Sequence, residues 1–143
     1  GARFAGAPTE VVEALTAYGE KVGVAFQLSD DILDIASESD ESGKTPGTDL
    51  REGVPTLPVL FARRSSDPAD ARLLELLDSD LTDDAAHAET LALLRNHPSM
   101  AASREYVVNL ANEAKALLQV LPESGPVRAT LEAFADVVAT RTA

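Results

Sequence analysis

The sequence predicts an all-α protein, a helical bundle, on three observations. Apolar residues recur every three or four positions along most of the chain, which is the period of an amphipathic helix. Aromatic residues make up only 4% of the chain, and no convincing run alternates apolar and polar residues as a strand does. Prolines and glycines fall between the periodic stretches, where helices begin and end.

The helices can be placed in order along the chain. Pro8-Thr9-Glu10 opens a first helix that runs to about Ile35, and residues 37–53, rich in Gly, Ser and Asp, form a loop. A short helix then runs from Pro55 to about Ser65. Later helices are expected after Asp67-Pro68, after the cap Thr82-Asp83-Asp84, at Pro98, and from Gly125-Pro126 to about Arg141.

Composition excludes several classes of function. The net charge of −12 and the pI near 4.4 argue against a nucleic-acid binder, which usually carries a basic face. Without cysteine there is no disulfide, thiolate metal site or thiol nucleophile. No apolar run reaches the length of a membrane span and no leader precedes the first helix, so we expect a cytoplasmic protein with no integral membrane segment.

The stretch GVAFQLSDDILDI, residues 23–35, places Asp30, Asp31 and Asp34 in an otherwise almost wholly apolar run. A helix that is apolar or small on nearly every side is expected to be buried. No Lys or Arg lies three or four positions from any of the three, which argues against an ion pair along the helix, although a solvated face stays open. Carboxylates in this pattern favour a hard cation such as Mg²⁺, which binds through one or two carboxylates plus phosphate oxygens.

Residues near the aspartates could complete a site. Gly19 and Gly23 lie on the same stripe, which favours either close helix packing or room for a substrate chain. Gln27 could donate a hydrogen bond, and Phe26 offers an apolar wall. In the segment GKTPGTDL, Lys44 is a point charge suited to diphosphate oxygens, although a single loop lysine is more often only solvated.

Other ionisable residues are expected to be structural. His87 and His97 have no partner four positions away and no matching acid, so they are expected on helix surfaces rather than in a metal site. Arg141 is expected to act as a favourable charge at the end of the last helix.

GVAFQLSDDILDI followed by GKTPGTDLREGVPTLPV resembles the second aspartate-rich region of the trans-isoprenyl (polyprenyl) diphosphate synthases. The motifs G-x-x-F-Q-x-x-D-D-x-x-D, G-K-x-x-G-x-D-L and T-L-P occur in order and at fitting spacing. The resemblance covers essentially all of residues 1–143, which are similar to the C-terminal portion of a polyprenyl synthetase domain. It implies part of the isoprenoid synthase fold and a protein that is typically a dimer.

The resemblance also implies roles for the candidate residues. Asp30 and Asp34 would ligate Mg²⁺ that bridges an allylic diphosphate, Asp31 would support them, and Lys44 would contact the diphosphate. The reaction that the resemblance implies is a prenyltransferase reaction of isoprenoid biosynthesis, the Mg²⁺-dependent condensation of isopentenyl diphosphate with an allylic diphosphate. The resemblance places Phe26 and Gln27 near isopentenyl diphosphate and the reacting carbons.

Two departures from the family pattern limit this interpretation. Val54 stands where the family commonly has a lysine, which removes one cationic contact. The family's first aspartate-rich motif lies upstream and does not occur here, so we expect the chain alone to have little or no synthase activity and to expose apolar helix faces. The alternatives are a non-catalytic or regulatory subunit that binds diphosphate or completes a partner's site, and a different all-α terpenoid enzyme, which the motif combination disfavours.

Overall fold

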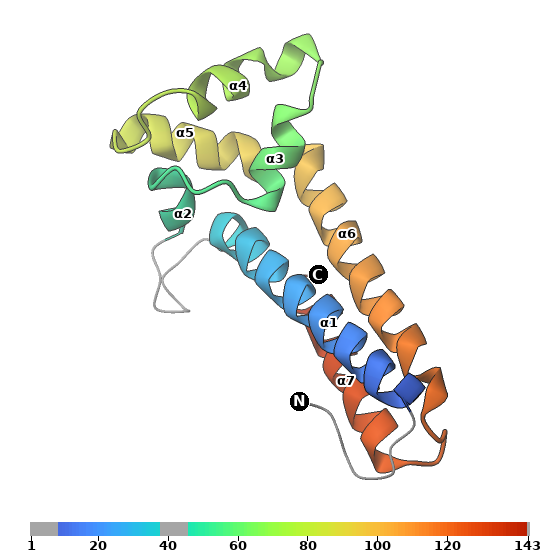
Figure 1. The fold of residues 1–143 in the computed structure, drawn as a ribbon. Helices are drawn as coiled ribbons and strands as arrows, with labels where there is room; N and C mark the ends of the chain where they lie inside the picture. Colours follow the sequence, from blue (N-terminus) through green and yellow to red (C-terminus); the bar gives the residue numbers. More distant parts are fainter. Residues whose placement is uncertain (1–8, 38–45, 143) are drawn as a thin grey trace. The chain divides into compact units, whose positions relative to one another are not determined.

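The computed structural model describes residues 9–37 and 46–142, and these ranges contain helices and no β-strand (Figure 1). The prediction of an all-α protein is therefore confirmed. None of the described helices combines the length and the apolar character needed to cross a lipid bilayer. The elements in chain order are α1 (Thr9–Ala36), α2 (Thr48–Arg51), α3 (Leu57–Arg63), the 3₁₀ turn η2 (Pro68–Asp70), α4 (Ala71–Leu77), α5 (Asp84–Arg95), α6 (Pro98–Ala116), the 3₁₀ turn η3 (Leu117–Val120) and α7 (Pro126–Thr140).

The helix boundaries agree with the capping residues in the sequence. Asp67 accepts a hydrogen bond from the Ala69 N–H over 2.9 Å, and Asp83 accepts one from the Ala86 N–H over 2.9 Å. One expectation is wrong, because α2 lies inside the segment predicted to be a loop. A helix of four residues is too short to show a period, so the apolar pattern could not reveal it.

The described residues fall into two compact units. The first unit joins the residues up to Ser29 with those from Tyr106 onward, and the second runs from Asp30 to Glu105. Helices α1 and α6 therefore each contribute one part to each unit.

In the first unit, α1, α6 and α7 are tied together by polar contacts between residues far apart in the sequence. The Tyr18 hydroxyl donates to the Leu131 carbonyl over 2.6 Å. Lys21 pairs with Glu113 at 3.0 Å. Between the three helices lie small and branched apolar residues, which let the helix axes approach closely. The fully buried ones are Ala25, Val107, Ala111, Ala114 and Ala135, with Leu118 and Val138 almost as buried.

The expectation that α1 is buried on nearly every side is wrong for this unit. Val24 is 50% exposed and Phe26 is 45% exposed, because the described residues of the unit cover only one face of the helix. Gly19 and Gly23 lie on the open side, where an added Cβ would have nothing within 4 Å. Close packing at these glycines is therefore excluded in the described part of the chain. Instead they line an apolar hollow of about 470 Å³, together with Tyr18, Val22, Phe26, Leu131 and Phe134.

In the second unit, α3, α4 and α5 pack on one another, and α3 and α5 are bonded to the last turns of α1. Arg95 of α5 ties the end of α1 to this unit, because its Nε donates to the Ile35 carbonyl over 2.8 Å and its Nη2 donates to the Ser37 carbonyl over 2.6 Å. The last carbonyls of a helix have no partner within the helix, so Arg95 satisfies groups that the fold would otherwise leave open. It also holds in place the part of α1 that carries the aspartates.

Replacing Arg95 with methionine is expected to lower the free energy of unfolding by about 1.5–3 kcal/mol, the usual range for a hydrogen bond from a charged group. The measurement is urea unfolding followed by circular dichroism. The control is Arg72→Met, because Arg72 pairs with Glu89 at 2.8 Å on the exposed surface, where a salt bridge contributes little to stability. Equal losses in the two variants would contradict the capping role of Arg95.

Candidate functional site

Three sequence motifs meet at the C-terminal end of α1, within the second unit. The last turns of the helix carry Asp31 and Asp34. The Gly47 N–H donates to the Asp34 carbonyl over 2.7 Å, which places the G-x-D-L turn against the helix end. The Leu57 N–H, in the T-L-P motif, donates to Asp31 Oδ2 over 3.4 Å. Figure 1 shows α2 beside the end of α1. Backbone N–H groups at α2 and at the start of α3 therefore reach the two carboxylates.

The carboxylate of Asp34 is only partly satisfied. Its Oδ1 accepts from the Asp49 N–H over 3.4 Å, whereas its Oδ2 is buried and has no hydrogen-bond partner among the described residues. Burial raises the pKa of Asp34 above its usual 3.8, the Asp49 carboxylate raises it further, and the backbone N–H groups of Thr48, Asp49 and Leu50 oppose the shift. Ionised Asp34 thus carries a negative charge that its surroundings compensate incompletely.

Asp31 has a similar environment. Burial raises its pKa, the hydrogen bond from the Leu57 backbone lowers it, and the charges of Asp49, Asp30 and Asp34 raise it. The charges that act on Asp31 are thus all negative. A cluster of this kind favours a bound cation, which would offset both the burial and the mutual repulsion.

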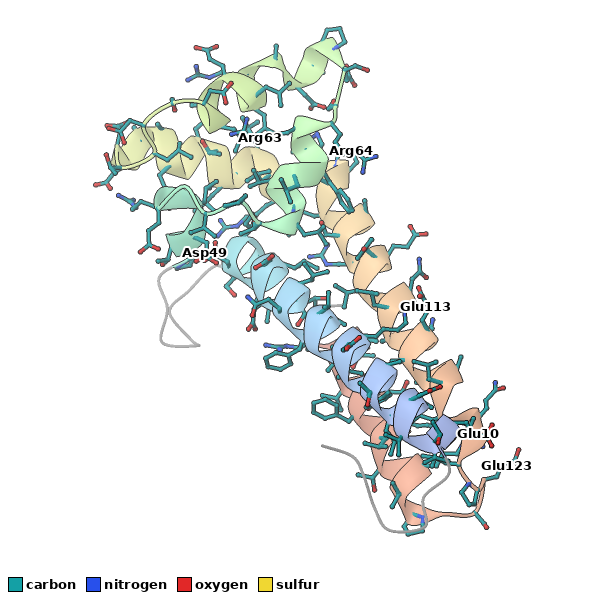
Figure 2. All side chains as sticks on the ribbon, in the orientation of Figure 1. Glu10, Asp49, Arg63, Arg64, Glu113 and Glu123 are labelled. Atoms are coloured by element: carbon teal, nitrogen blue, oxygen red, sulfur yellow. The ribbon has the colours of Figure 1, made fainter. Side chains whose placement is uncertain are left out.

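Asp49 is the site residue that the sequence reasoning missed. It lies in the first turn of α2, and Figure 2 shows it beside the end of α1. Its charge acts on both Asp31 and Asp34. The sequence feature that could have identified Asp49 is its place as the aspartate of the G-x-D-L motif, two residues after the turn glycine Gly47.

The donor set fits a magnesium ion that has further ligands. Among the residues that the structure describes, no three His, Asp or Glu side chains converge into a group able to hold a metal ion. Mg²⁺ commonly uses only one or two carboxylates and completes its shell with water and phosphate oxygens. The buried, unpartnered Oδ2 of Asp34 is the kind of oxygen that such an ion would take. The ligand set Asp30, Asp31 and Asp34 stays a prediction.

The other predicted site residues, Phe26, Gln27 and Lys44, are not among the described residues of the second unit. Phe26 and Gln27 belong to the first unit and are exposed. The Arg141 guanidinium lies over the Phe26 ring, 4.4 Å from its centroid, so this arginine does more than end α7. Lys44 lies outside the described residues.

The expectation that both histidines lie on helix surfaces is wrong. His87 is only 5% exposed, and its Nε2 is 2.8 Å from the Gly47 carbonyl oxygen. The His97 side chain is 10% exposed, and its Nε2 is 2.9 Å from Asp70 Oδ2. His87 is thus buried and His97 is mostly covered, and each bonds to a residue far away in the sequence, which helical spacing alone does not reveal.

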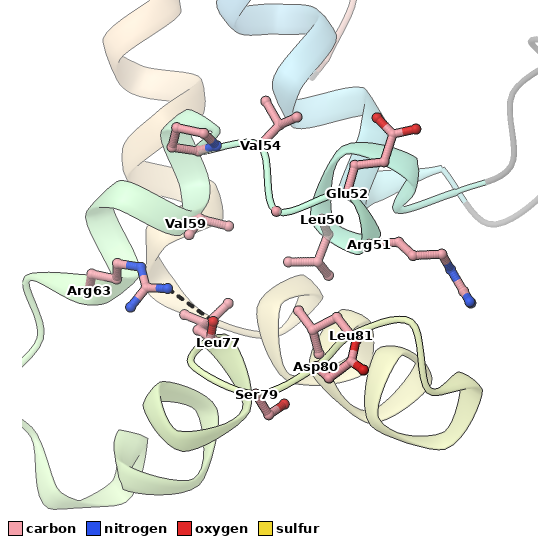
Figure 3. Close-up of a pocket in the computed structure, with 12 residues that line it drawn as sticks. Leu50, Arg51, Glu52, Val54, Val59, Arg63, Leu77, Ser79, Asp80 and Leu81 are labelled. Atoms are coloured by element: carbon pink, nitrogen blue, oxygen red, sulfur yellow. Dashed lines mark hydrogen bonds between the residues drawn. The ribbon is translucent and has the colours of Figure 1, made fainter.

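A hollow in the second unit, of about 250 Å³, lies between the loop after α2 and the segment after α4 (Figure 3). Its two arginines already have partners. Arg51 pairs with Asp84 at 2.9 Å, while Arg63 donates to the Leu77 carbonyl over 3.0 Å and pairs with Asp78 at 2.8 Å. Val54, at the position where the family commonly has a lysine, lines this hollow and is 43% exposed. The hollow therefore offers no uncommitted arginine to an anion.

Comparison with known proteins decides the family. Residues 1–94 match the family model of the polyprenyl synthetases. The chain belongs to the polyprenyl synthetase family. The resemblance stated from the aspartate motifs is thereby confirmed.

Relatives in this family are similar along nearly the whole chain. A nonaprenyl diphosphate synthase of Mycobacterium tuberculosis is 50% identical over 141 residues, which are 99% of this chain and 42% of that protein. An octaprenyl diphosphate synthase of Escherichia coli is 34% identical over 138 residues, 96% of this chain and 42% of that protein. The chain thus spans less than half the length of these relatives.

Solved structures agree on the fold. A geranylgeranyl pyrophosphate synthase from Corynebacterium glutamicum, complexed with calcium and isoprenyl diphosphate, superposes with a TM-score of 0.87 at 40% identity. The match covers 96% of this chain and 42% of that one. The chain therefore has part of the helical fold of the prenyl synthases, as the sequence predicted.

Proposed function

We propose that this chain is the C-terminal portion, residues 1–143, of the polyprenyl synthetase domain of a trans-prenyltransferase. The whole protein would condense isopentenyl diphosphate with an allylic diphosphate, in a reaction that depends on Mg²⁺. The family supports this reaction class, and one neighbour of known structure was crystallised with calcium and isoprenyl diphosphate. A homodimeric assembly and a cytoplasmic location stay predictions.

One observation carries the proposal, namely the carboxylate cluster at the end of α1. Asp31 and Asp34 are held by backbone N–H groups from two further motif segments, and Asp34 Oδ2 has no hydrogen-bond partner in the described chain. A structural role alone does not explain why Asp31 and Asp34 are partly buried beside other negative charges, so that burial and these charges raise their pKa values, because burying uncompensated charge lowers stability. A site for a cation and its diphosphate does explain them.

The chain's own residues would each perform a simple task. Asp30, Asp31 and Asp34 would hold the cation, and Asp49 would add negative charge beside them. The chemistry supplied by bound Mg²⁺ is neutralisation of the charge that develops on the diphosphate leaving group.

Outside this cluster, three residues would act on the substrates. Lys44 would contact the diphosphate as a cation. Phe26 would present an apolar ring to the reacting carbons and exclude water, and its orientation is supported by the stacked Arg141 guanidinium. Gln27, the next residue of α1, would donate a hydrogen bond that orients isopentenyl diphosphate.

The test is the Mg²⁺-dependent condensation of farnesyl diphosphate with labelled isopentenyl diphosphate, run on the whole protein and on the 143-residue chain alone. We expect product from the whole protein and little or none from the chain alone, because the family's first aspartate-rich motif does not occur in these 143 residues. Turnover by the chain alone would contradict the second expectation.

The same assay separates the alternative, a non-catalytic subunit that binds diphosphate or completes a partner's site. Val54 in place of a lysine is the observation that favours this alternative. A whole protein that binds Mn²⁺ and inorganic diphosphate but forms no product, except when a second protein is added, would support the subunit and contradict the enzyme.

A further inference from the structure

His87 connects α5 to the turn that precedes α2. Its ring is buried, with Nε2 2.8 Å from the Gly47 carbonyl oxygen and Nδ1 3.2 Å from Arg51 Nη2. A carbonyl oxygen can only accept a hydrogen bond, so Nε2 must carry the proton. A guanidinium can only donate, so Nδ1 must be unprotonated. Both bonds therefore exist only in the neutral Nε2–H tautomer of His87.

The surroundings of His87 fix this arrangement from both sides. Arg51 is itself anchored, because its Nη1 donates to the Thr82 carbonyl over 3.0 Å and pairs with Asp84 at 2.9 Å. On the other side, Gly47 has φ 75°, and an added Cβ would lie 2.6 Å from His87 Nε2. Only a residue without a side chain lets the imidazole reach the carbonyl oxygen at this position.

The peptide groups of Gly47 transmit this contact to the aspartate cluster. The Gly47 carbonyl accepts from His87, while the Gly47 N–H donates to the Asp34 carbonyl over 2.7 Å. Two residues later, the Asp49 N–H donates to Asp34 Oδ1. A shift of the turn would therefore move both the Asp49 carboxylate and the N–H groups that hold Asp34.

We propose that His87 is a positioning residue for the carboxylate cluster: through Gly47, it fixes the turn that aligns Asp49 with Asp34. This inference rests on the proposed function in so far as the cluster binds a cation. His87 does not touch the carboxylates, so its effect must pass through the backbone of the turn. No feature of the helical spacing of His87 predicts this role.

The experiment compares His87→Asn with His87→Gln in the whole protein. A Gln side chain can place its amide N–H where Nε2–H stands, whereas an Asn side chain is too short to reach the Gly47 carbonyl. We expect the dissociation constant for Mn²⁺, measured by electron paramagnetic resonance with inorganic diphosphate present, to rise about tenfold in the Asn variant and to stay within about twofold in the Gln variant. Unchanged Mn²⁺ affinity in a folded Asn variant would overturn the proposal.

Two readouts are independent of metal binding and activity. Nitrogen NMR of the wild-type protein should show His87 as the neutral Nε2–H tautomer, and the Nδ1–H tautomer would overturn the proposal. Hydrogen exchange of the Gly47 amide should speed up in the Asn variant and remain protected in the Gln variant. If the wild-type protein binds no Mn²⁺, the proposed function fails while the exchange rates still decide whether His87 holds the turn.

Discussion

The change Asp34→Asn is expected to lower the condensation rate of the whole protein on the order of 1,000-fold, and the folded chain should be at least as stable as before. The loss of rate is expected because the change would remove a proposed metal ligand, and the charge stabilisation that a bound metal supplies amounts to several kcal/mol, at about 1.4 kcal/mol per factor of ten. Stability should not fall, because an uncharged amide replaces a partly buried carboxylate whose Oδ2 has no partner among the described residues. Steady-state kinetics and thermal unfolding of the same preparation measure the two effects.

The effect of Asp34→Asn on stability should depend on pH in a defined direction. Burial raises the pKa of Asp34 above 3.8, so the folded chain binds this proton more tightly than the unfolded chain does. Below pH 3.8 the carboxylate is protonated in both states and does not lower the free energy of unfolding. The full loss of stability applies once the pH exceeds the folded-state pKa. The difference in melting temperature between Asp34→Asn and wild type should grow with pH across this window.

A matched control is Asp136→Asn, which removes the same charge from α7. Asp136 is exposed and pairs with Lys115 at 2.7 Å. Its replacement should leave the rate unchanged and should change stability little. If Asp34→Asn destabilises the fold strongly while the rate is preserved, Asp34 is structural and the proposed metal site is wrong.

The second large effect is expected from Gly47→Ala, which should lower the free energy of unfolding by about 2–4 kcal/mol. Two costs add up. A left-handed backbone conformation disfavours any residue with a Cβ, and here φ is 75°. The new methyl group would also lie 2.6 Å from His87 Nε2 and 2.9 Å from Leu91 Cδ2, so the buried ring must move. Chemical denaturation measures the loss.

Gly53→Ala separates these two costs. Gly53 has φ 77°, almost the same conformation, but an added Cβ there meets nothing within 4 Å. Only the backbone cost of about 1–2 kcal/mol should appear. The difference between the two variants then measures the contact with His87 and Leu91, and equal losses would show that this contact contributes nothing.

The sequence predicted the parts of the fold that depend on local chemistry. Asp67 and Asp83 cap helices because their side chains bond to N–H groups two or three residues later, which is a short-range effect. The aspartate motif and its family were likewise found from residues that are close together in the chain.

The features that the sequence did not predict depend on residues that are distant in the chain. His87 is buried because Gly47 lies beside it, at a separation of 40 positions. Phe26 is exposed because no described helix covers its face of α1. The hydrophobic pattern predicts that a face can pack, but it does not predict which helices will cover that face. The role of Asp49 became visible only when α2, a single turn without a period, was placed against α1.

The order of the two units along the chain has a consequence for folding kinetics. The second unit is formed by one continuous segment, Asp30–Glu105, which is inserted between the two halves of the first unit. The hydrogen bond from Tyr18 to Leu131 closes a separation of 113 positions. The first unit therefore has the higher contact order. Its folding must first overcome the entropy of closing this long loop, before the stabilising contacts form. We therefore expect the carboxylate-bearing segment to acquire protected amides first, and the three-helix unit to wait until α7 has been synthesised.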